Sequence, residues 1–431
     1  MAESVLPSSP AAPGGQAPRS RAPGFFQPLH RRDFRLLVAG QTTSTAGDFL
    51  FIVAFPFLLL HSGAGVGGLG VALTVLGVTR VAGTLLGGLA ADRRPPRTVM
   101  IATDATRVGV LAVLAYELAT GSPKLWQFAV AAAVIGALEG LFLPAYRAIT
   151  PAVLPEPELA AGNAAGESLN TAAAILGQLV AGVALSALGA AAVVGIDAAT
   201  FLVSTATLLA MSGRSSSRPA DPTDSTDSTD TTATASPAVR FREYALRSRL
   251  YLTITVMTGM VSITAAGLFA VGLPVLADRR FASAAESYGV LLVGVAAGRL
   301  AGSLAAGRIA AGRRRGRVTL ALLVVHGAVL TSLPALHQLG PLLPALTVLG
   351  FADGTLLVLV VTVIQQMVPR ELLGRAMAAM AFVQTGSFPI SVALAGFAVG
   401  RWGLTTAFTA GGVGVLAIAA LGAGQKVVRD A

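Results

Sequence analysis

Five ionisable side chains stand inside stretches that are otherwise apolar. Two are arginines, Arg80 and Arg299, which open the hexapeptides RVAGTL and RLAGSL. The others are the acids Asp48, Glu139 and Asp353. A charge in apolar surroundings needs an oppositely charged partner or access to water, because an unpaired buried charge is costly. Burial favours the protonated form of a carboxyl group, and a nearby arginine favours the ionised form. Ion pairing and proton exchange are therefore the chemistry that these residues offer.

Composition sets the surroundings of these residues. Hydrophobic residues make up 54% of the chain and charged residues 12%, with 49 glycines. Apolar runs recur along the chain, and about 20 residues of helix cross the roughly 30 Å hydrocarbon layer of a bilayer. The sequence therefore predicts an all-α membrane protein with twelve transmembrane helices in two pseudo-symmetric six-helix bundles. The predicted helices span residues 34–60, 66–90, 98–118, 125–146, 163–187, 189–211, 249–276, 285–307, 316–336, 341–367, 372–400 and 403–424.

Segments of low hydrophobicity divide the chain. Residues 1–30 are rich in Pro, Ala, Gly and Ser and lack the apolar core of a signal peptide, which predicts a disordered cytoplasmic tail. Residues 213–248 contain DPTDSTDSTD, which is typical of a flexible cytoplasmic linker. This linker separates an N-terminal six-helix bundle at 31–212 from a C-terminal six-helix bundle at 249–424, and residues 425–431 form a second cytoplasmic tail.

Basic residues are distributed unevenly over the loops. The net charge of +10 would also fit a nucleic-acid-binding protein, but most of the 31 Lys and Arg residues fall in alternate loops rather than in one patch. This distribution follows the positive-inside rule. Heavy use of Arg over Lys, with abundant Ala and Gly, indicates a GC-rich bacterial genome. We therefore expect a multi-pass protein of the bacterial inner (plasma) membrane, surrounded by lipid, with both termini cytoplasmic and no nucleic-acid partner.

Several function classes lack the residues they require. The absence of cysteine excludes disulfides, thiolate metal sites and cysteine nucleophiles, and the 4 histidines lack metal-ligand spacing. The sequence has neither an HExxH motif nor a glycine-rich phosphate loop ending in Lys-Ser/Thr. We therefore expect no metal, no cofactor, no enzymatic activity and no nucleotide-driven pumping.

The two predicted bundles repeat one another. Arg80 corresponds to Arg299 in the paired hexapeptides, and Glu139 in GALEG (136–140) corresponds to Asp353 in GFADG (350–354). Parallel repeats of six membrane helices are a transporter architecture in which two halves rock around a central site. Charges present in both halves fit a role in the shared scaffold or in the rocking motion, and a role in the substrate cavity is the alternative.

Four stretches of the chain carry motifs that can be compared with known families: FRLLVAGQTTSTAGDF (34–49), GLAADRRPPRTVMIATDATR (88–107), LFLPAYRAITPAVLPEPELAAGN (141–163) and VPRELLGRAM (368–377). These stretches resemble the major facilitator superfamily, and within it the drug and siderophore exporter branch that includes enterobactin-exporter-like and macrolide-efflux-like proteins. The resemblance implies the major facilitator fold, with a cavity lined by helices 1, 4, 7 and 10. It therefore implies that Asp48, Glu139 and Asp353 surround that cavity. The sequence departs from antiporter patterns at Gln178, which stands where a proline is typical, and by the lack of arginine in helix 4.

The loop after the second predicted helix is similar to the signature loop of that superfamily. Gly88, Asp92, Arg93 and Arg97 fall on its glycine, aspartate and basic positions, whereas Pro95 replaces its second glycine. Salt bridges and helix-end contacts from these residues are expected to form a conformational latch. A solvated basic loop that binds anionic lipid is the alternative.

Asp48 is the leading candidate for proton coupling. It has no acidic counterpart in the second half, because residues 249–276 contain no ionisable residue beyond the first position. At about 1.5 Å of rise per residue, Asp48 and Arg80 lie at matching depths and are expected to pair. A pair that only fixes helix packing is the alternative. Asp197 is interpreted as a packing or capping residue near the outer end.

These features predict a secondary active exporter of a small amphipathic drug-like molecule or metabolite. We expect it to work as a monomer by proton antiport and alternating access, with the small-molecule substrate and protons as its ligands. Uptake or facilitated diffusion is the alternative within transport, and a membrane receptor or sensor on the same fold is the alternative from another class. The identity and charge of the cargo do not follow from the sequence.

Overall fold

Helices make up every regular element in the part of the chain that the structure describes. The structure is a computed structural model that describes residues 26–91, 94–121, 123–212, 237–310 and 315–425. Ten of its helices are long and apolar enough to cross a membrane. The helices are α1 (Arg32–His61), α2 (Gly65–Ala91), α3 (Pro96–Thr120), α4 (Leu125–Val153), α5 (Leu159–Ala210), α6 (Pro237–Arg247), α7 (Arg249–Gly267), α8 (Leu273–Arg280), α9 (Ala284–Ala310), α10 (Arg315–Ser332), α11 (Leu339–Met367) and α12 (Arg370–Gly424), with short turns η1 (Gln27–His30), η2 (Glu156–Glu158), η5 (Leu268–Gly272) and η6 (Leu333–Ala335).

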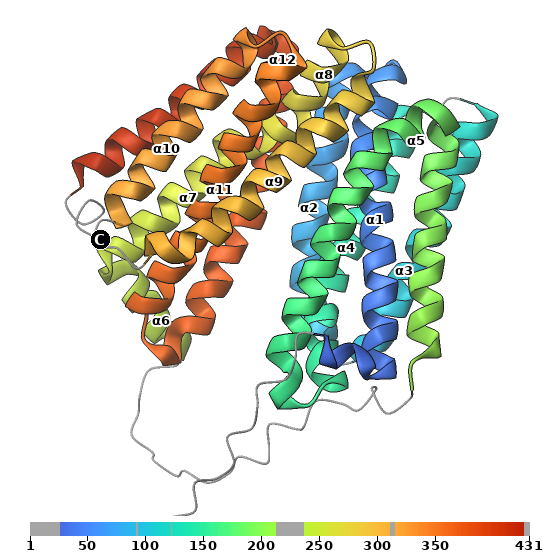
Figure 1. The fold of residues 1–431 in the computed structure, drawn as a ribbon, viewed down its shortest axis with the longest axis horizontal. Helices are drawn as coiled ribbons and strands as arrows, with labels where there is room; N and C mark the ends of the chain where they lie inside the picture. The colour runs from blue at the N-terminus through green and yellow to red at the C-terminus, as the bar shows by residue number, and fades with distance from the viewer. Residues whose placement is uncertain (1–25, 92–93, 122, 213–236, 311–314, 426–431) are drawn as a thin grey trace, which may run out of the picture.

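The two longest helices each contain two membrane crossings. α5 has 52 residues and α12 has 55, and at about 1.5 Å per residue a straight helix of that length would reach roughly 80 Å. Each is broken at one glycine with a left-handed backbone, Gly189 (φ 79°) and Gly403 (φ 84°). Such a φ suits glycine because it has no Cβ. Figure 1 shows the α5 ribbon doubling back on itself. Because α7, η5 and α8 form one continuous crossing (Arg249–Arg280), the described residues make twelve crossings, as predicted.

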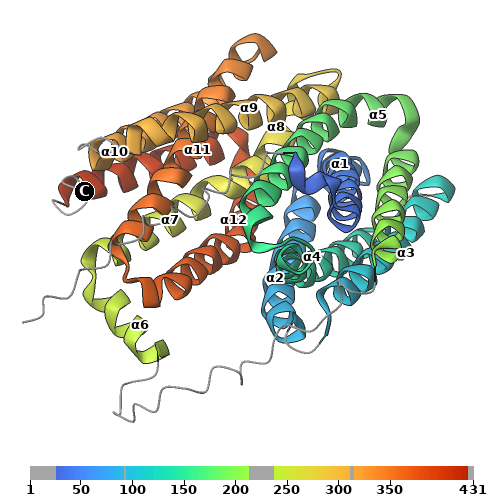
Figure 2. The ribbon, with the colours of Figure 1, turned by 60° about the horizontal axis from the view of Figure 1, so that its bottom comes forward.

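The crossings form two bundles, which we call the N-half (α1–α5) and the C-half (α7–α12). Figures 1 and 2 show the two bundles side by side. Within the N-half, Gly140 of α4 packs against the carbonyl oxygen of Arg80 in α2. Within the C-half, Gly354 of α11 packs against the carbonyl oxygen of Arg299 in α9. The repeated glycines therefore hold the same helix pair at close range in each half, and the pseudo-symmetry predicted from the sequence is present in the packing.

The halves join at one end of the molecule and separate at the other. We call the end where α1 and α3 finish and where α5 and α12 turn the hairpin end, and the end where α1 begins and α6 lies the linker end. One large buried apolar cluster combines residues of both halves on the hairpin side, and within it the rings of Phe57 and Tyr288 lie 5.8 Å apart. At the linker end each half has its own cluster, around Phe34 in the N-half and Tyr251 in the C-half. The structure is therefore closed at the hairpin end, and Figure 1 shows the bundles diverging toward α6.

The C-terminal part of the predicted linker is helical. Residues 213–236 lie outside the described residues, whereas 237–247 form α6. Tyr244 of α6 donates a hydrogen bond of 2.9 Å from its hydroxyl to the carbonyl oxygen of Met367. Phe241 packs edge-on against Tyr251 of α7. These contacts attach α6 to the C-half. They place aromatic side chains of α6 against the linker ends of α7 and α11.

Candidate functional site

A cavity of about 270 Å³ lies between the two halves. Its charged lining residues come from the N-half, and Tyr288 and Phe388 of the C-half close its other side. The lining consists of charged and aromatic side chains together with apolar residues. The charged ones are Asp48, Arg80, Arg107, Glu139 and Asp197, and the aromatic ones are Phe51, Phe55, Phe201, Tyr288 and Phe388. The cavity thus combines several charges with aromatic surface.

Asp48 faces this cavity from the middle of α1. Its side chain forms no hydrogen bond and no ion pair within the described part of the chain, in contrast to the other lining carboxylates. The preceding residue, Gly47, packs against α5 so closely that a Cβ there would lie 2.6 Å from Oδ1 of Asp197. Asp197 is buried and accepts a hydrogen bond of 3.4 Å from the Thr200 hydroxyl. Two carboxylates therefore border the cavity at the same contact of α1 with α5, which places Asp197 at the site rather than in a peripheral packing role.

Arg80 pairs with Glu139 and not with Asp48. Its Nε lies 3.3 Å from Oε2 of Glu139, so the predicted Asp48–Arg80 pair is wrong. The reason is helix packing: α2 lies along α4, where Gly83 and Gly140 allow backbone contact, whereas α1 packs mainly along α5. The depths of Asp48 and Arg80 match, but depth does not determine which helices are neighbours.

The equivalent pair of the C-half joins Arg299 of α9 to Asp353 of α11. Oδ2 of Asp353 accepts hydrogen bonds from Nη2 of Arg299 and from Nε at 3.1 Å. Both side chains remain accessible, at 58% and 35% of their surface, and neither lines the cavity described above. The expectation that Asp353 borders the same cavity as Asp48 is therefore not met in this conformation, because the residues that close the cavity from the C-half come from η5, α9 and α12.

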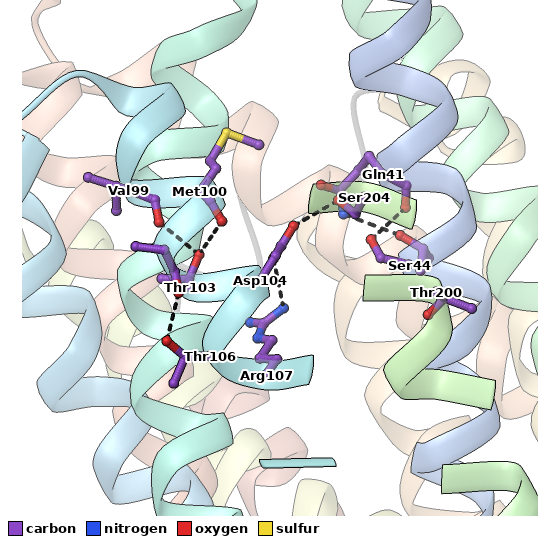
Figure 3. Close-up of polar contacts among 12 residues, drawn as sticks. Gln41, Ser44, Val99, Met100, Thr103, Asp104, Thr106, Arg107, Thr200 and Ser204 are labelled. Atoms are coloured by element: carbon purple, nitrogen blue, oxygen red, sulfur yellow. Dashed lines mark hydrogen bonds and ion pairs between the residues drawn. The ribbon is translucent and has the colours of Figure 1, made fainter. Parts of the chain in front are cut away.

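The sequence did not lead us to predict a site at a buried charged pair on α3. Arg107 and Asp104 are almost completely buried, and Nη1 of Arg107 lies 3.9 Å from Oδ1 of Asp104. The hydroxyl of Ser204 donates a hydrogen bond of 2.7 Å to the other carboxylate oxygen, as Figure 3 shows. The guanidinium lies 4.8 Å from the ring centre of Phe201 and 5.4 Å from that of Phe142. The signal was present in TDATR (103–107), since an acid and an arginine three residues apart share one helix face.

Of the predicted latch residues, Gly88 and Arg97 lie among the residues that the structure describes. Asp92 and Arg93 lie outside the described residues. Gly88 is exposed, with open space where a side chain would stand. Arg97 donates hydrogen bonds of 2.8 Å to the carbonyl oxygen of Leu208 and 3.0 Å to that of Leu209. A cation at a helix C-terminus satisfies carbonyl groups that lack intrahelical partners, so Arg97 caps the end of α5 within the N-half.

The sequence matches the model of a known protein family over most of its length. The model of the Major Facilitator Superfamily matches residues 37–391. The chain belongs to this superfamily. Among its curated relatives is the multidrug efflux pump Tap of Mycolicibacterium fortuitum, which is 26% identical over 388 residues that cover 87% of this chain and 91% of the relative. The Tap pump of Mycobacterium tuberculosis (strain ATCC 25618 / H37Rv) is 25% identical over 391 residues, which cover 87% and 89% of the two chains.

Solved structures of two transporters share the fold. The nucleoside transporter NupG superposes with a TM-score of 0.71 at 12% identity, covering 91% of this chain and 98% of its own. The peptide transporter POT in complex with sulfate superposes with a TM-score of 0.71 at 13% identity, covering 94% and 95%. This chain is therefore a multi-pass transporter of the major facilitator fold.

Proposed function

We propose that this transporter is a secondary active exporter of a small amphipathic molecule, driven by proton antiport in the bacterial plasma membrane. The observation that carries the proposal is Asp48, a carboxylate without a cationic partner in the described residues, located in a cavity between the two halves. A carboxylate in such a place binds either a proton or a cationic substrate, because either one neutralises its charge. Because the proton and the cationic substrate compete for the Asp48 carboxylate, the protein carries one of them in each direction across the membrane.

Export is the direction that the names of the curated relatives favour, and the open linker end is compatible with it. The basic loops put the linker end in the cytoplasm by the positive-inside rule, and the halves are separated there and joined at the hairpin end. In this arrangement the cavity takes its cargo from the cytoplasm. The relatives named multidrug efflux pump support the same direction.

The cavity lining favours an amphipathic cation as cargo. Arg80 is paired with Glu139 and Arg107 with Asp104, and among the described residues no guanidinium lies within salt-bridge distance of the Asp48 or Asp197 carboxylate. The lining rings offer faces that attract cations, worth about 0.5–2 kcal/mol each. An anion would instead meet two unpaired carboxylates, and like charges in a cavity are unfavourable.

Alternating access follows from the duplicated halves. When the hairpin end opens and the linker end closes, Asp48 faces the outside, where a proton displaces the cation. The protonated, neutral Asp48 then allows the return to the conformation seen here, and the proton leaves toward the cytoplasm. The binding steps of this cycle change the charge of one carboxyl group. The cavity that contains this group is accessible from one side of the membrane at a time.

The direct test is transport in liposomes with an imposed pH gradient. Purified protein should move ethidium against its concentration gradient into the acidic compartment, and Asp48→Asn should abolish this accumulation. Asp33→Asn is the matched control, because Asp33 lies on the same helix at the linker end and accepts a hydrogen bond from the Ser212 backbone. This variant should accumulate ethidium like the parent.

The alternative functions give different results in the same assay. A facilitator equilibrates ethidium without regard to the pH gradient, an importer accumulates it in the opposite direction, and a receptor binds it without flux. Full pH-driven accumulation by Asp48→Asn would show that another group carries the proton.

A further inference from the structure

A histidine and an acid join the two halves at the hairpin end. His61 is the last residue of α1, and Asp278 lies in the last turns of α8. Nε2 of His61 lies 3.2 Å from Oδ1 of Asp278. This contact connects the N-half to the C-half where the structure is closed. It borders a second cavity, of about 560 Å³, which also contains Glu286.

The contact of the second ring nitrogen of His61, Nδ1, determines which of the two ring nitrogens carries the hydrogen in the neutral imidazole. Nδ1 lies 2.9 Å from the carbonyl oxygen of Phe57. A carbonyl oxygen only accepts hydrogen bonds, so Nδ1 must carry the hydrogen. In the neutral imidazole Nε2 then has a lone pair and accepts as well. A lone pair would face an ionised carboxylate at 3.2 Å, which is repulsive.

The contact becomes attractive when one proton is added. Either Nε2 carries it, and an imidazolium donates to the Asp278 carboxylate, or Asp278 carries it and donates to Nε2. In both arrangements the pair holds one proton more than a neutral histidine beside an ionised acid. The surface of the His61 side chain is 68% accessible and that of Asp278 27%, so solvent protons reach the pair.

We infer that His61 and Asp278 form a proton-binding site across the two halves, which is occupied when the hairpin end is closed and emptied when it opens. Opening separates the two residues, so the proton loses one of the two groups that hold it. The closed state then binds one proton more than the open state. Acid therefore stabilises the closed hairpin end and alkali releases it. This inference goes beyond the antiport at Asp48, because it concerns the closure of the hairpin end and requires no cargo.

The charged groups around the pair are engaged elsewhere or exposed. Glu286 of α9 accepts a hydrogen bond of 2.8 Å from the Ser186 hydroxyl of α5. Arg280 donates to carbonyl oxygens of η6, among them that of Pro334 at 2.6 Å. Arg279, which follows Asp278 directly, is exposed. On α3, Glu117 accepts from the side chain of Gln127 at 2.6 Å. The Ser186–Glu286 hydrogen bond also joins the halves, and the His61–Asp278 contact adds a link in which both partners can carry a proton.

The experiment measures closure directly, without cargo and without a gradient. The natural chain has no cysteine, so spin labels can be attached at Thr120→Cys and Gln338→Cys, exposed positions at the hairpin end of the two halves. Electron–electron distance measurements from pH 8 to pH 5.5 should show the short-distance population growing as pH falls. One linked proton changes the ratio of closed to open molecules by at most about tenfold per pH unit.

Two substitutions separate the proton site from a general effect of pH. His61→Gln should remove the pH dependence. Asp278→Asn should also remove it but should keep the short distance at both pH values, because an amide N–H can donate to Nε2 of the neutral histidine. His337→Gln is the matched control: His337 is exposed at the same end, and its Nδ1 lies 2.8 Å from the carbonyl oxygen of Ala335. Its substitution should leave the response unchanged.

Two outcomes would overturn the inference. One is an unchanged pH response in His61→Gln, and the other is an Asp278→Asn variant whose short-distance population still grows as pH falls, as in the parent. The closed distance of Asp278→Asn at pH 8 also demonstrates that the variant folds. A failure of Asp48→Asn to uncouple transport would not affect these distances, so the two proposals fail independently.

Discussion

Arg299 contacts Asp353 through two of its nitrogens, and it does so at the position where Arg80 contacts Glu139 in the other half. Each pair bridges helices that are already held together by a glycine packed on the carbonyl oxygen of the arginine. Duplication of the charges and of the glycines together indicates a role in the shared scaffold. The proposed proton coupling is assigned to Asp48, which has no acidic counterpart in α7.

The first prediction concerns the Arg299–Asp353 pair. Arg299→Gln or Asp353→Asn alone leaves one charge without a partner, whereas the double variant leaves none. Because the pair is accessible, each single change should lower the free energy of unfolding by no more than about 1 kcal/mol. Transport should suffer more in each single variant than in the double variant. Initial efflux rates and melting temperatures of the three proteins measure this, and an additive loss in the double variant would contradict it.

The second prediction concerns the glycine contacts. Gly354→Ala would bring a Cβ against the carbonyl oxygen of Arg299, so α9 and α11 must move apart. Overpacking of this kind costs about 1–3 kcal/mol. Gly340→Ala is the control on the same helix, since a Cβ there meets nothing within 4 Å. Thermal unfolding in detergent should show destabilisation in Gly354→Ala and not in Gly340→Ala.

The sequence predicts the fold because hydrophobic length and charge distribution determine how often a chain crosses a bilayer. It also locates the breaks of the long helices, since the predicted spans 189–211 and 403–424 begin at Gly189 and Gly403, where α5 and α12 are broken. The duplicated arginines and acids were visible as well, because a charge in an apolar run is conspicuous.

Pairing between helices was less accessible from the sequence. Asp48 and Arg80 were expected to meet because neighbouring helices in sequence were assumed to be neighbours in space. The actual partner of Arg80 follows from glycines at matching heights on α2 and α4, which are visible only when both helices are aligned. Arg107 was overlooked because its acid lies on the same helix, where the pair resembles an ordinary surface contact.

The third prediction concerns the buried pair of α3. Arg107→Met leaves the Asp104 carboxylate in the interior with only Ser204 as partner, and removal of one member of a buried ion pair costs about 3–5 kcal/mol. Addition of Asp104→Asn should recover a large part of this loss. Arg35→Met, which removes an exposed arginine from α1, is the control and should change stability little. Equal melting temperatures of the Arg107→Met and Arg35→Met variants would contradict the proposed burial.

The fourth prediction is a pH dependence at the linker end. Arg31 donates hydrogen bonds of 2.7 and 2.9 Å to the two carboxylate oxygens of Glu158, and these bonds hold the pKa of Glu158 below its ordinary value of 4.5. A lowered pKa in the folded state means that the carboxylate stabilises the protein above pH 4.5 and that this contribution disappears as pH falls through the lowered pKa.

Glu158→Gln should therefore melt below the parent at neutral pH, and the difference should shrink in acid as pH falls through the lowered pKa of Glu158. Glu156→Gln is the matched control, because Glu156 lies on the same η2 turn and forms no ion pair within the described residues. Melting temperatures of the three proteins from pH 7 to pH 3 measure the effect. A difference between Glu158→Gln and the parent that persists unchanged at pH 3 would show that the Arg31 contact acts through packing, since protonation of Glu158 would then have no consequence.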